Sequence, residues 1–81
     1  MAYAEDIEAL IRRWKAEDEE AREIRRREAD WKFIEKQPEP VKQALKFFVE
    51  TGNFRLAARL AGMSLDEFNE LRIKARIPIV V

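Results

Sequence analysis

The sequence predicts an all-α, dimeric protein in which a long N-terminal helix precedes a three-helix unit containing a helix-turn-helix. Three observations predict this fold class. Apolar residues recur at helical spacing before Pro38, in a stretch without Gly or Pro. Pro38 and Pro40 then disfavour helix in the residue before each of them. Beyond them, Gly52 and Gly62 divide the remaining sequence into three shorter helical patterns.

The first region, residues 1–37, is expected to be one charged amphipathic helix over residues 3–36. Six of its eight heptad a and d positions are apolar, and the exceptions are Glu17 and Glu28. At about 50 Å it would be too long to pack fully on the rest of the chain. We expect it to pair with a second copy or a partner, because its tryptophan side chains would otherwise remain exposed to solvent. The candidate interface residues on it are Ile7, Leu10, Trp14, Ala21, Ile24 and Trp31.

The charges along this helix are segregated into an acidic run, 17–20, and a basic run, 25–27. An antiparallel pair would place the acidic run of one copy opposite the basic run of the other, whereas a parallel pair would juxtapose like charges. The alternative interpretation is a solvated helix in which these charges only provide solubility and pairs between successive turns.

The second region, residues 38–81, begins with a helix expected from Pro40 to Thr51, since proline suits a first helical position. Gly52 is suited to ending it. Its apolar face consists of Val41, Ala44, Leu45, Phe48 and Val49, widened by Phe47.

Two further helices follow in close succession. Asn53 is the expected N-cap of a helix over residues 54–61, with Arg55 and Arg59 pointing outward. Its inward residues are expected to be Leu56, Ala57, Leu60 and Ala61. Ser64 and Glu67 match a capping box that begins the next helix, whose apolar face contains Phe68, Leu71 and Ala75.

These two helices match a helix-turn-helix. Ala58 is the small residue needed where the helices cross, and Gly62, four residues on, suits the positive φ of the turn. The second helix would present its outer face to base edges, but Asp66 and Glu70 on that face repel phosphates. The candidate DNA-binding residues are Arg55, Arg59, Ser64, Asn69, Arg72, Lys74 and Arg76. In the competing interpretation the motif is a compact packing unit for a protein partner.

The tail, residues 77–81, is apolar and prone to extended structure. It is expected either to pack within the chain or to add as a strand to a partner or a second copy. The candidate interface residues in it are Ile79, Val80 and Val81.

Composition argues against catalysis. The chain has no Cys and no His, which removes disulfides, thiolate and imidazole metal sites and the commonest general base. Charged residues make up 40% of it, the N-terminus lacks a signal-peptide pattern and no apolar run could span a bilayer. We expect a cytoplasmic protein without catalytic residues, metal or cofactor. High charge and few amides fit a thermophile.

Residues 41–81 resemble a family of small prokaryotic predicted antitoxins that contain a helix-turn-helix. The best-matching stretch is 60–64, Leu-Ala-Gly-Met-Ser, with Glu67 and Phe68 following and an Ile-Pro tail at 77–78. The resemblance implies binding to a cognate toxin, often a PIN-domain ribonuclease, and often to operator DNA. The function expected is therefore that of an antitoxin-like or transcription-regulator-like binding protein. The alternative is a homodimeric adaptor whose helix-turn-helix does not bind DNA.

Overall fold

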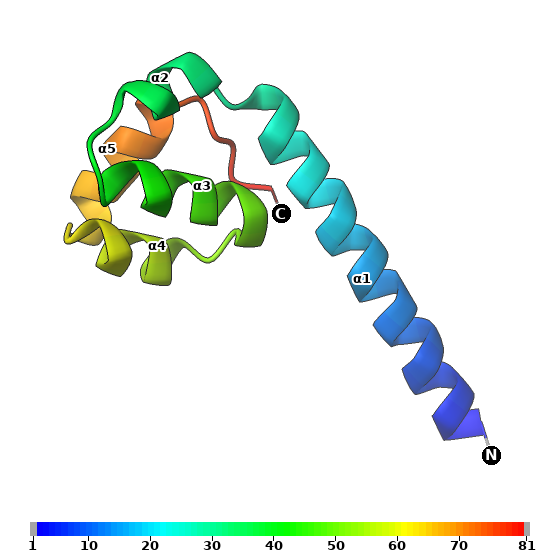
Figure 1. Ribbon diagram of the computed structural model, residues 1–81. Helices are drawn as coiled ribbons and strands as arrows, with labels where there is room; N and C mark the ends of the chain where they lie inside the picture. The colour runs from blue at the N-terminus through cyan, green and yellow to red at the C-terminus, as the bar shows by residue number, and fades with distance from the viewer. Residues whose placement is uncertain (1, 81) are drawn as a thin grey trace.

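The architecture is all-helical. A computed structural model describes the backbone of residues 2–80, with side chains continuous from 18 to 80 and, before them, those of Ala9, Arg12 and Ala16. Over this part there is no strand, and the elements are α1 (Ala2–Glu28), α2 (Trp31–Lys36), α3 (Val41–Thr51), α4 (Phe54–Ala61) and α5 (Leu65–Lys74). Residues 29–80 form a head from which α1 projects, and the tail after α5 runs back toward α1 (Figure 1).

The expectation of one helix over residues 3–36 is wrong, because the helix stops at Glu28 and a new one starts at Trp31. Asp30 is the N-cap of α2, and its Oδ1 accepts the N–H of Phe33 at 3.1 Å. The backbone N–H of Asp30 donates to the carbonyl of Ala75 at 2.7 Å, which ties the break to the end of α5. Trp31 therefore does not continue the apolar stripe of α1.

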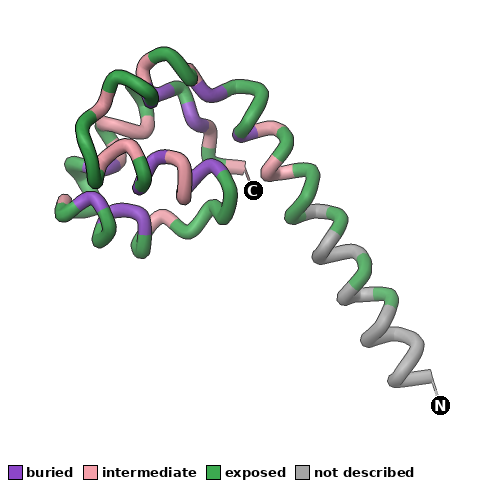
Figure 2. The backbone as a smooth tube through the Cα atoms, in the orientation of Figure 1, coloured by how far each residue is buried: buried purple, intermediate pink, exposed green. Residues whose placement is uncertain are grey.

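The central element of the head is α3, which contacts α1, α2 and α4. Its expected inward face is confirmed, since Ala44, Leu45, Phe48 and Val49 are buried and Val41 and Phe47 pack against them (Figure 2). The helix starts at Val41, one residue later than expected, with Pro40 as its N-cap. Gly52 ends it in the left-handed conformation, at φ +68°.

The expected inward face of α4 is partly wrong. Ala57, Ala58 and Ala61 are buried, but Leu56 and Leu60 are 38% and 47% exposed. Three alanines on one face allow α4 to lie close against α3, and the leucines, one helical turn apart, then point away from the core. The expected outward direction of Arg55 and Arg59 is confirmed, as both are exposed.

Three phenylalanines from different parts of the head form its aromatic centre. Phe48, Phe54 and Phe68 make edge-to-face pairs with ring centroids 5.4 to 5.9 Å apart. This geometry favours contact between the positive edge of one ring and the negative face of the next. The centre thus links α3, the start of α4 and α5.

The tail continues the core and then leaves it. Ile77 is 1% exposed, so its side chain packs within the same chain, whereas Ile79 is 57% exposed. Val80 is intermediate. The alternative of packing within the chain therefore holds for Ile77 and not for Ile79.

Candidate functional site

The corner between α4 and α5 is fixed by its backbone. Gly62 adopts φ +71°, and the N–H of Met63 donates to the carbonyl of Ala58 at 3.0 Å. Ser64 then caps α5: its hydroxyl accepts the N–H of Glu67 at 3.2 Å, and the Glu67 carboxylate accepts the N–H of Ser64 at 3.1 Å. The expected capping box is confirmed. The outer surface that the two helices present is consequently well defined.

The outer face of α5 combines apolar and acidic side chains. Leu65 and Ile73 are 46% and 58% exposed, and Asp66 and Glu70 lie exposed on the same side of the helix. The hydrogen bonds from Ser64 lower the pKa of the third acidic group, Glu67, so this carboxylate is charged at neutral pH. Such a face repels a phosphate backbone and suits a protein surface.

Two of the candidate DNA-binding residues are engaged with each other. The Arg72 guanidinium donates to Oδ1 of Asn69 from Nε at 3.1 Å and from an amino group at 2.9 Å. A second amino group of Arg72 donates to the carbonyl of Ile77 at 2.9 Å. This arrangement fastens the tail to α5, and it uses the oxygen with which Asn69 would accept from an adenine.

The other five candidate DNA-binding residues are exposed, in two groups. Arg55 and Arg59 on α4 line a shallow hollow with Ser64 and Leu65. Lys74 and Arg76 lie at the opposite end of α5. The structure brings the first group together and leaves the second separate from it.

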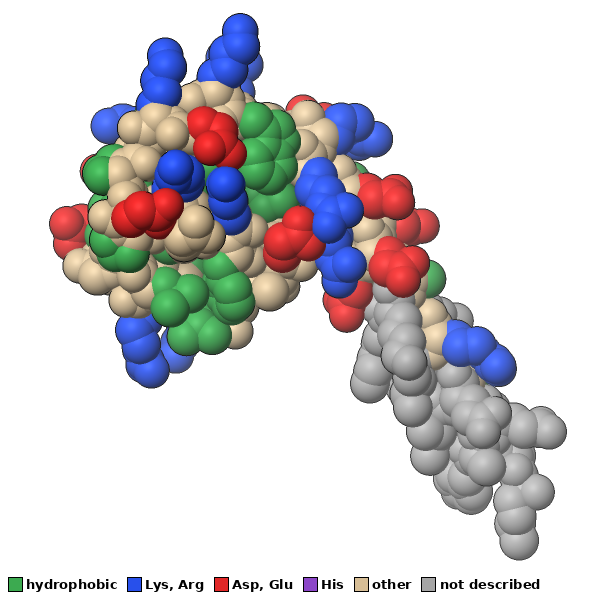
Figure 3. Space-filling view, viewed as in Figure 1, with side chains coloured by type: hydrophobic (Ala, Val, Ile, Leu, Met, Phe, Trp, Pro, Cys, Tyr) green, Lys and Arg blue, Asp and Glu red, His purple; other side chains and the backbone are tan. Residues whose placement is uncertain are grey.

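Next to these arginines, the outer face of α4 is apolar. Leu56 and Leu60 lie one turn apart, flanked by Arg55 and Arg59 at the same spacing. Hydrophobic side chains gather at the end of the head where α4 lies, beside protruding basic side chains (Figure 3). Sequence reasoning missed this surface because it assigned both leucines to the core. The alanines of α4 were the available signal, because they form the buried face of the helix without Leu56 and Leu60.

Apart from Ile79 and Val80 in the tail, described above, the candidate interface residues fall into three groups. Four of them, Ile7, Leu10, Trp14 and Val81, lie outside the described side chains. Ala21 and Ile24 are partly exposed on the last turns of α1. Trp31 is 38% exposed, and its indole N–H donates to the carbonyl of Arg26 at 2.8 Å, which satisfies an acceptor at the end of α1.

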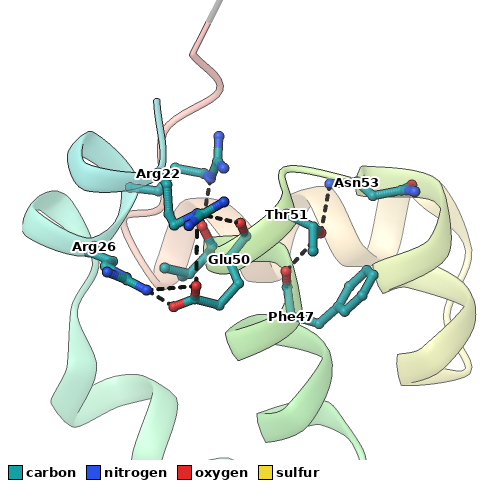
Figure 4. Close-up of polar contacts among 8 residues, drawn as sticks. Arg22, Arg26, Phe47, Glu50, Thr51 and Asn53 are labelled. Carbon is teal, nitrogen blue, oxygen red and sulfur yellow. Dashed lines mark hydrogen bonds and ion pairs between the residues drawn. The ribbon is translucent and has the colours of Figure 1, made fainter. Parts of the chain in front are cut away.

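The junction of α1 with the end of α3 is built from arginines, a feature that sequence reasoning missed. Nε of Arg25 donates to the carbonyl of Val49 at 2.8 Å, and Nε of Arg22 donates to that of Glu50 at 3.1 Å. Arg26 binds the Glu50 carboxylate through two hydrogen bonds, at 2.9 and 2.7 Å (Figure 4). These cations satisfy the last carbonyls of α3 and complement its dipole.

The electrostatics of this junction follow from burial and pairing. The hydrogen bond from Arg26 lowers the pKa of Glu50 and, in return, raises the pKa of Arg26. Burial lowers the pKa of Arg25, with a further contribution from the nearby charge of Arg22. Arg25 is 7% exposed and remains charged at neutral pH, since an arginine pKa lies far above it. The arginines and the carbonyls that they bind lie 24 and 28 residues apart in the sequence, which explains why no local pattern predicts these bonds.

Within the described residues, no three His, Cys, Asp or Glu side chains lie close enough together to hold a metal ion. Nor does any helix in that part of the chain combine the length and the apolar character needed to cross a membrane.

No protein-family model, no curated protein and no solved structure matches this chain. The likeness of residues 41–81 to the antitoxin family therefore stays a prediction that depends on its motif residues.

Proposed function

We propose that this chain is an antitoxin-like binding protein whose α4–α5 corner docks onto another protein. The observation that carries the proposal is the composition of the corner's outer surface. It displays four exposed large apolar side chains, and Asp66 and Glu70 lie on the face that a DNA-reading helix would turn toward base edges, where they repel the phosphates. The apolar residues concerned are Leu56, Leu60, Leu65 and Ile73.

A protein partner fits this surface better than DNA for a second reason. Arg72 and Asn69, two of the candidate DNA-binding residues on α5, are bonded to each other, and Arg72 is also bonded to the tail. Contact with DNA through these side chains would break hydrogen bonds from a charged donor, each contributing about 1.5–3 kcal/mol. Protein interfaces instead use apolar anchors with arginine beside them, as Leu60 and Arg59 are arranged.

The test is co-expression of the chain with the product of the adjacent gene, followed by size-exclusion chromatography. A complex is expected with the parent chain. Replacement of Leu56 and Leu60 together by Ser should weaken it at least about tenfold, since each loses an apolar anchor worth about 1 kcal/mol or more.

The matched control replaces Lys74 and Arg76 by Ser, two exposed residues away from the α4 face, and should leave the complex intact. A complex that is formed equally well by the leucine variant would place the partner elsewhere. Absence of any complex with the adjacent gene product would remove the antitoxin part of the proposal.

DNA binding is the second candidate function, favoured by the exposed pair Arg55 and Arg59 beside Ser64. It predicts that the affinity for the protein's own promoter falls steeply with salt, with two fewer phosphate contacts after Arg55→Gln and Arg59→Gln. Fluorescence anisotropy with a duplex from that promoter measures this. A double variant with the parent's salt dependence would count against DNA contact through α4.

The proposal also includes a homodimer formed through α1, called the arm from here on, a location in the cytoplasm and no catalytic role. Three features support it. The head is small and buries little surface of its own. Ala21 and Ile24 remain partly exposed along α1. The sequence repeats the same stripe toward the N-terminus.

A further inference from the structure

The junction of α1, α3 and the tail contains a cleft whose arginines are only partly used. Arg22 and Arg25 lie three residues apart on α1, and each is anchored through Nε to a carbonyl on the last turn of α3. A guanidinium is planar, and a carbonyl bound at Nε does not occupy the N–H groups of its two terminal amino groups. Arg22 and Arg25, fixed in this way, each keep two terminal amino groups that can donate hydrogen bonds side by side.

The terminal amino groups of Arg25 face this cleft. Arg25 is 7% exposed and lines two adjoining hollows, of about 330 and 80 Å³. Among the described residues, an acceptor is present only for the Nε of Arg25. No fully buried polar side-chain atom in this part of the chain lacks a partner, so the terminal amino groups of Arg25 are not fully buried. Gly52 lies against the guanidinium, where a Cβ would come within 3.0 Å of it and restrict the approach.

The charge of the cleft suits a single negative group. Arg22 and Arg25 line it with Asp18 and Glu50, and the Glu50 carboxylate is already bound by Arg26. Three cations against two carboxylates leave one positive charge in excess. A carboxylate matches that excess, whereas a doubly charged phosphate would exceed it and meet Asp18 at the rim.

Apolar side chains form one part of the walls next to the arginines. Ala21 and Val80 contribute to the larger hollow, whose lining is mainly polar, whereas the smaller hollow is mainly apolar and includes Phe48, Phe54 and Pro78. A ligand with a negative charge bound by the guanidinium groups could therefore place its uncharged part against this apolar surface.

We propose that this cleft binds a carboxylate carried on a small apolar group, which Arg22 and Arg25 hold through paired hydrogen bonds from their terminal amino groups. The carboxylate belongs either to a free organic acid or to an acidic side chain of another protein. The site goes beyond the function proposed above, since it shares no lining residue with the α4–α5 hollow.

The test is an NMR titration of the full chain with sodium butyrate, with the capped peptide acetyl-Ala-Glu-Ala-amide and with sodium phosphate at constant ionic strength. Saturable shifts of the Arg22 and Arg25 Nε–Hε signals and of the Gly52 N–H are expected with a carboxylate. Tighter binding of butyrate identifies a free acid as the source, and tighter binding of the peptide identifies a protein side chain. No saturation with either carboxylate, or equal saturation with phosphate, overturns the proposal.

Variants separate the site from a general charge effect. Arg22→Gln should weaken carboxylate binding at least about tenfold, because a charge-assisted fork is lost. Arg27→Gln is the matched control, an exposed arginine of α1 that contacts Glu28 instead, and should bind as the parent does. Arg25→Gln, checked for folding by circular dichroism, should abolish binding, and if it unfolds, Arg22→Gln alone decides. Parent-like binding by Arg22→Gln contradicts the assignment.

Discussion

Two glycines end consecutive helices in the same left-handed conformation but in different surroundings. Gly52, at φ +68°, lies against the Arg25 guanidinium, whereas a Cβ on Gly62, at φ +71°, would meet nothing within 4 Å. Gly62→Ala should thus lose about 1–2 kcal/mol of unfolding free energy from backbone strain alone. Gly52→Ala should lose about 1 kcal/mol more, because the bond from Arg25 to Val49 prevents the guanidinium from moving aside.

Urea denaturation of the two variants at one pH measures this difference. Equal losses would mean that the guanidinium does move away. Removing the guanidinium with Arg25→Gln should bring the effect of Gly52→Ala down to that of Gly62→Ala, and this coupling is the control.

The pairing of Glu50 with Arg26 predicts how stability depends on pH. The pKa of Glu50 is lowered in the folded chain, so the unfolded chain binds more protons at acidic pH. The stabilisation is complete above the ordinary pKa of a glutamate and is lost as the pH falls below that pKa and through the lowered pKa of the folded chain.

Glu50→Gln isolates this contribution from those of Glu35 and Glu67, whose pKa values are also lowered. The variant should be less stable than the parent at pH 7, and the difference should shrink toward pH 3. Thermal unfolding across that range measures it. A difference that does not change with pH would show that the ion pair contributes nothing.

At the scale of residues, the sequence predicts most of the local contacts and none of the long-range ones made by the arginines of α1. Asn53, Ser64 and Glu67 were predicted as caps because their partners lie three residues away along the chain. The sequence predicts Arg25 as part of a basic run that either faces an acidic run of a second copy or is solvated. Its actual acceptor lies 24 residues away, and no pattern in α1 distinguishes Arg25 from Arg27.

At the scale of elements, the break between α1 and α2 depends on Asp30. Its side chain caps α2, so Asp30→Ala should lose about 1 kcal/mol of unfolding free energy. Asn53→Ala, which removes the equivalent cap of α4, should lose a similar amount. Glu19→Ala on the exposed side of α1 is the control. Chemical denaturation compares the three, and a loss for Asp30 as small as that for Glu19 would mean that other contacts fix the break.

The stretch around the break contains no Gly or Pro, the residues that most often interrupt a helix, so its apolar periodicity predicts one continuous helix. Asp30 is a favoured N-cap residue type directly before the apolar Trp31, which is a local sequence signal for a new helix. The local sequence does not explain why α1 ends at this point. The Asp30 N–H is satisfied by the carbonyl of Ala75, which the fold brings to it from 45 positions away.

The orientation of α4 gives a second prediction at this scale. Leu60 points away from the core, so Leu60→Ser should change the unfolding free energy by no more than about 0.5 kcal/mol. Leu45→Ala, at a residue with 0% exposure, should lose about 2–5 kcal/mol. Urea denaturation of both variants checks the assignment. A large loss at Leu60 would show that the leucine is covered, either by the head or by a second copy.

At the scale of the whole molecule, the described contacts bear on how two copies would pair. The antiparallel arrangement expected from the charge runs requires a free basic run at 25–27. Arg25 is buried against α3 and Arg26 is bound to Glu50, which leaves Arg27 to face an acidic run. Pairing through the arm therefore has to depend on its apolar stripe rather than on charge.

Dimerisation through that stripe makes a prediction about concentration and salt. The melting temperature should rise by about 3–6 °C for each tenfold increase in protein concentration, as mass action requires of a dimer that unfolds to monomers. The rise should persist at about 1 M NaCl, where exposed charge pairs are screened. Trp14→Ala, at the centre of the predicted stripe, should abolish it, while Leu60→Ser should not. Calorimetry over a hundredfold range of protein concentration measures this. A melting temperature that does not depend on concentration contradicts the dimer. A rise that vanishes in high salt shows that charge, and not the apolar stripe, joins the two copies.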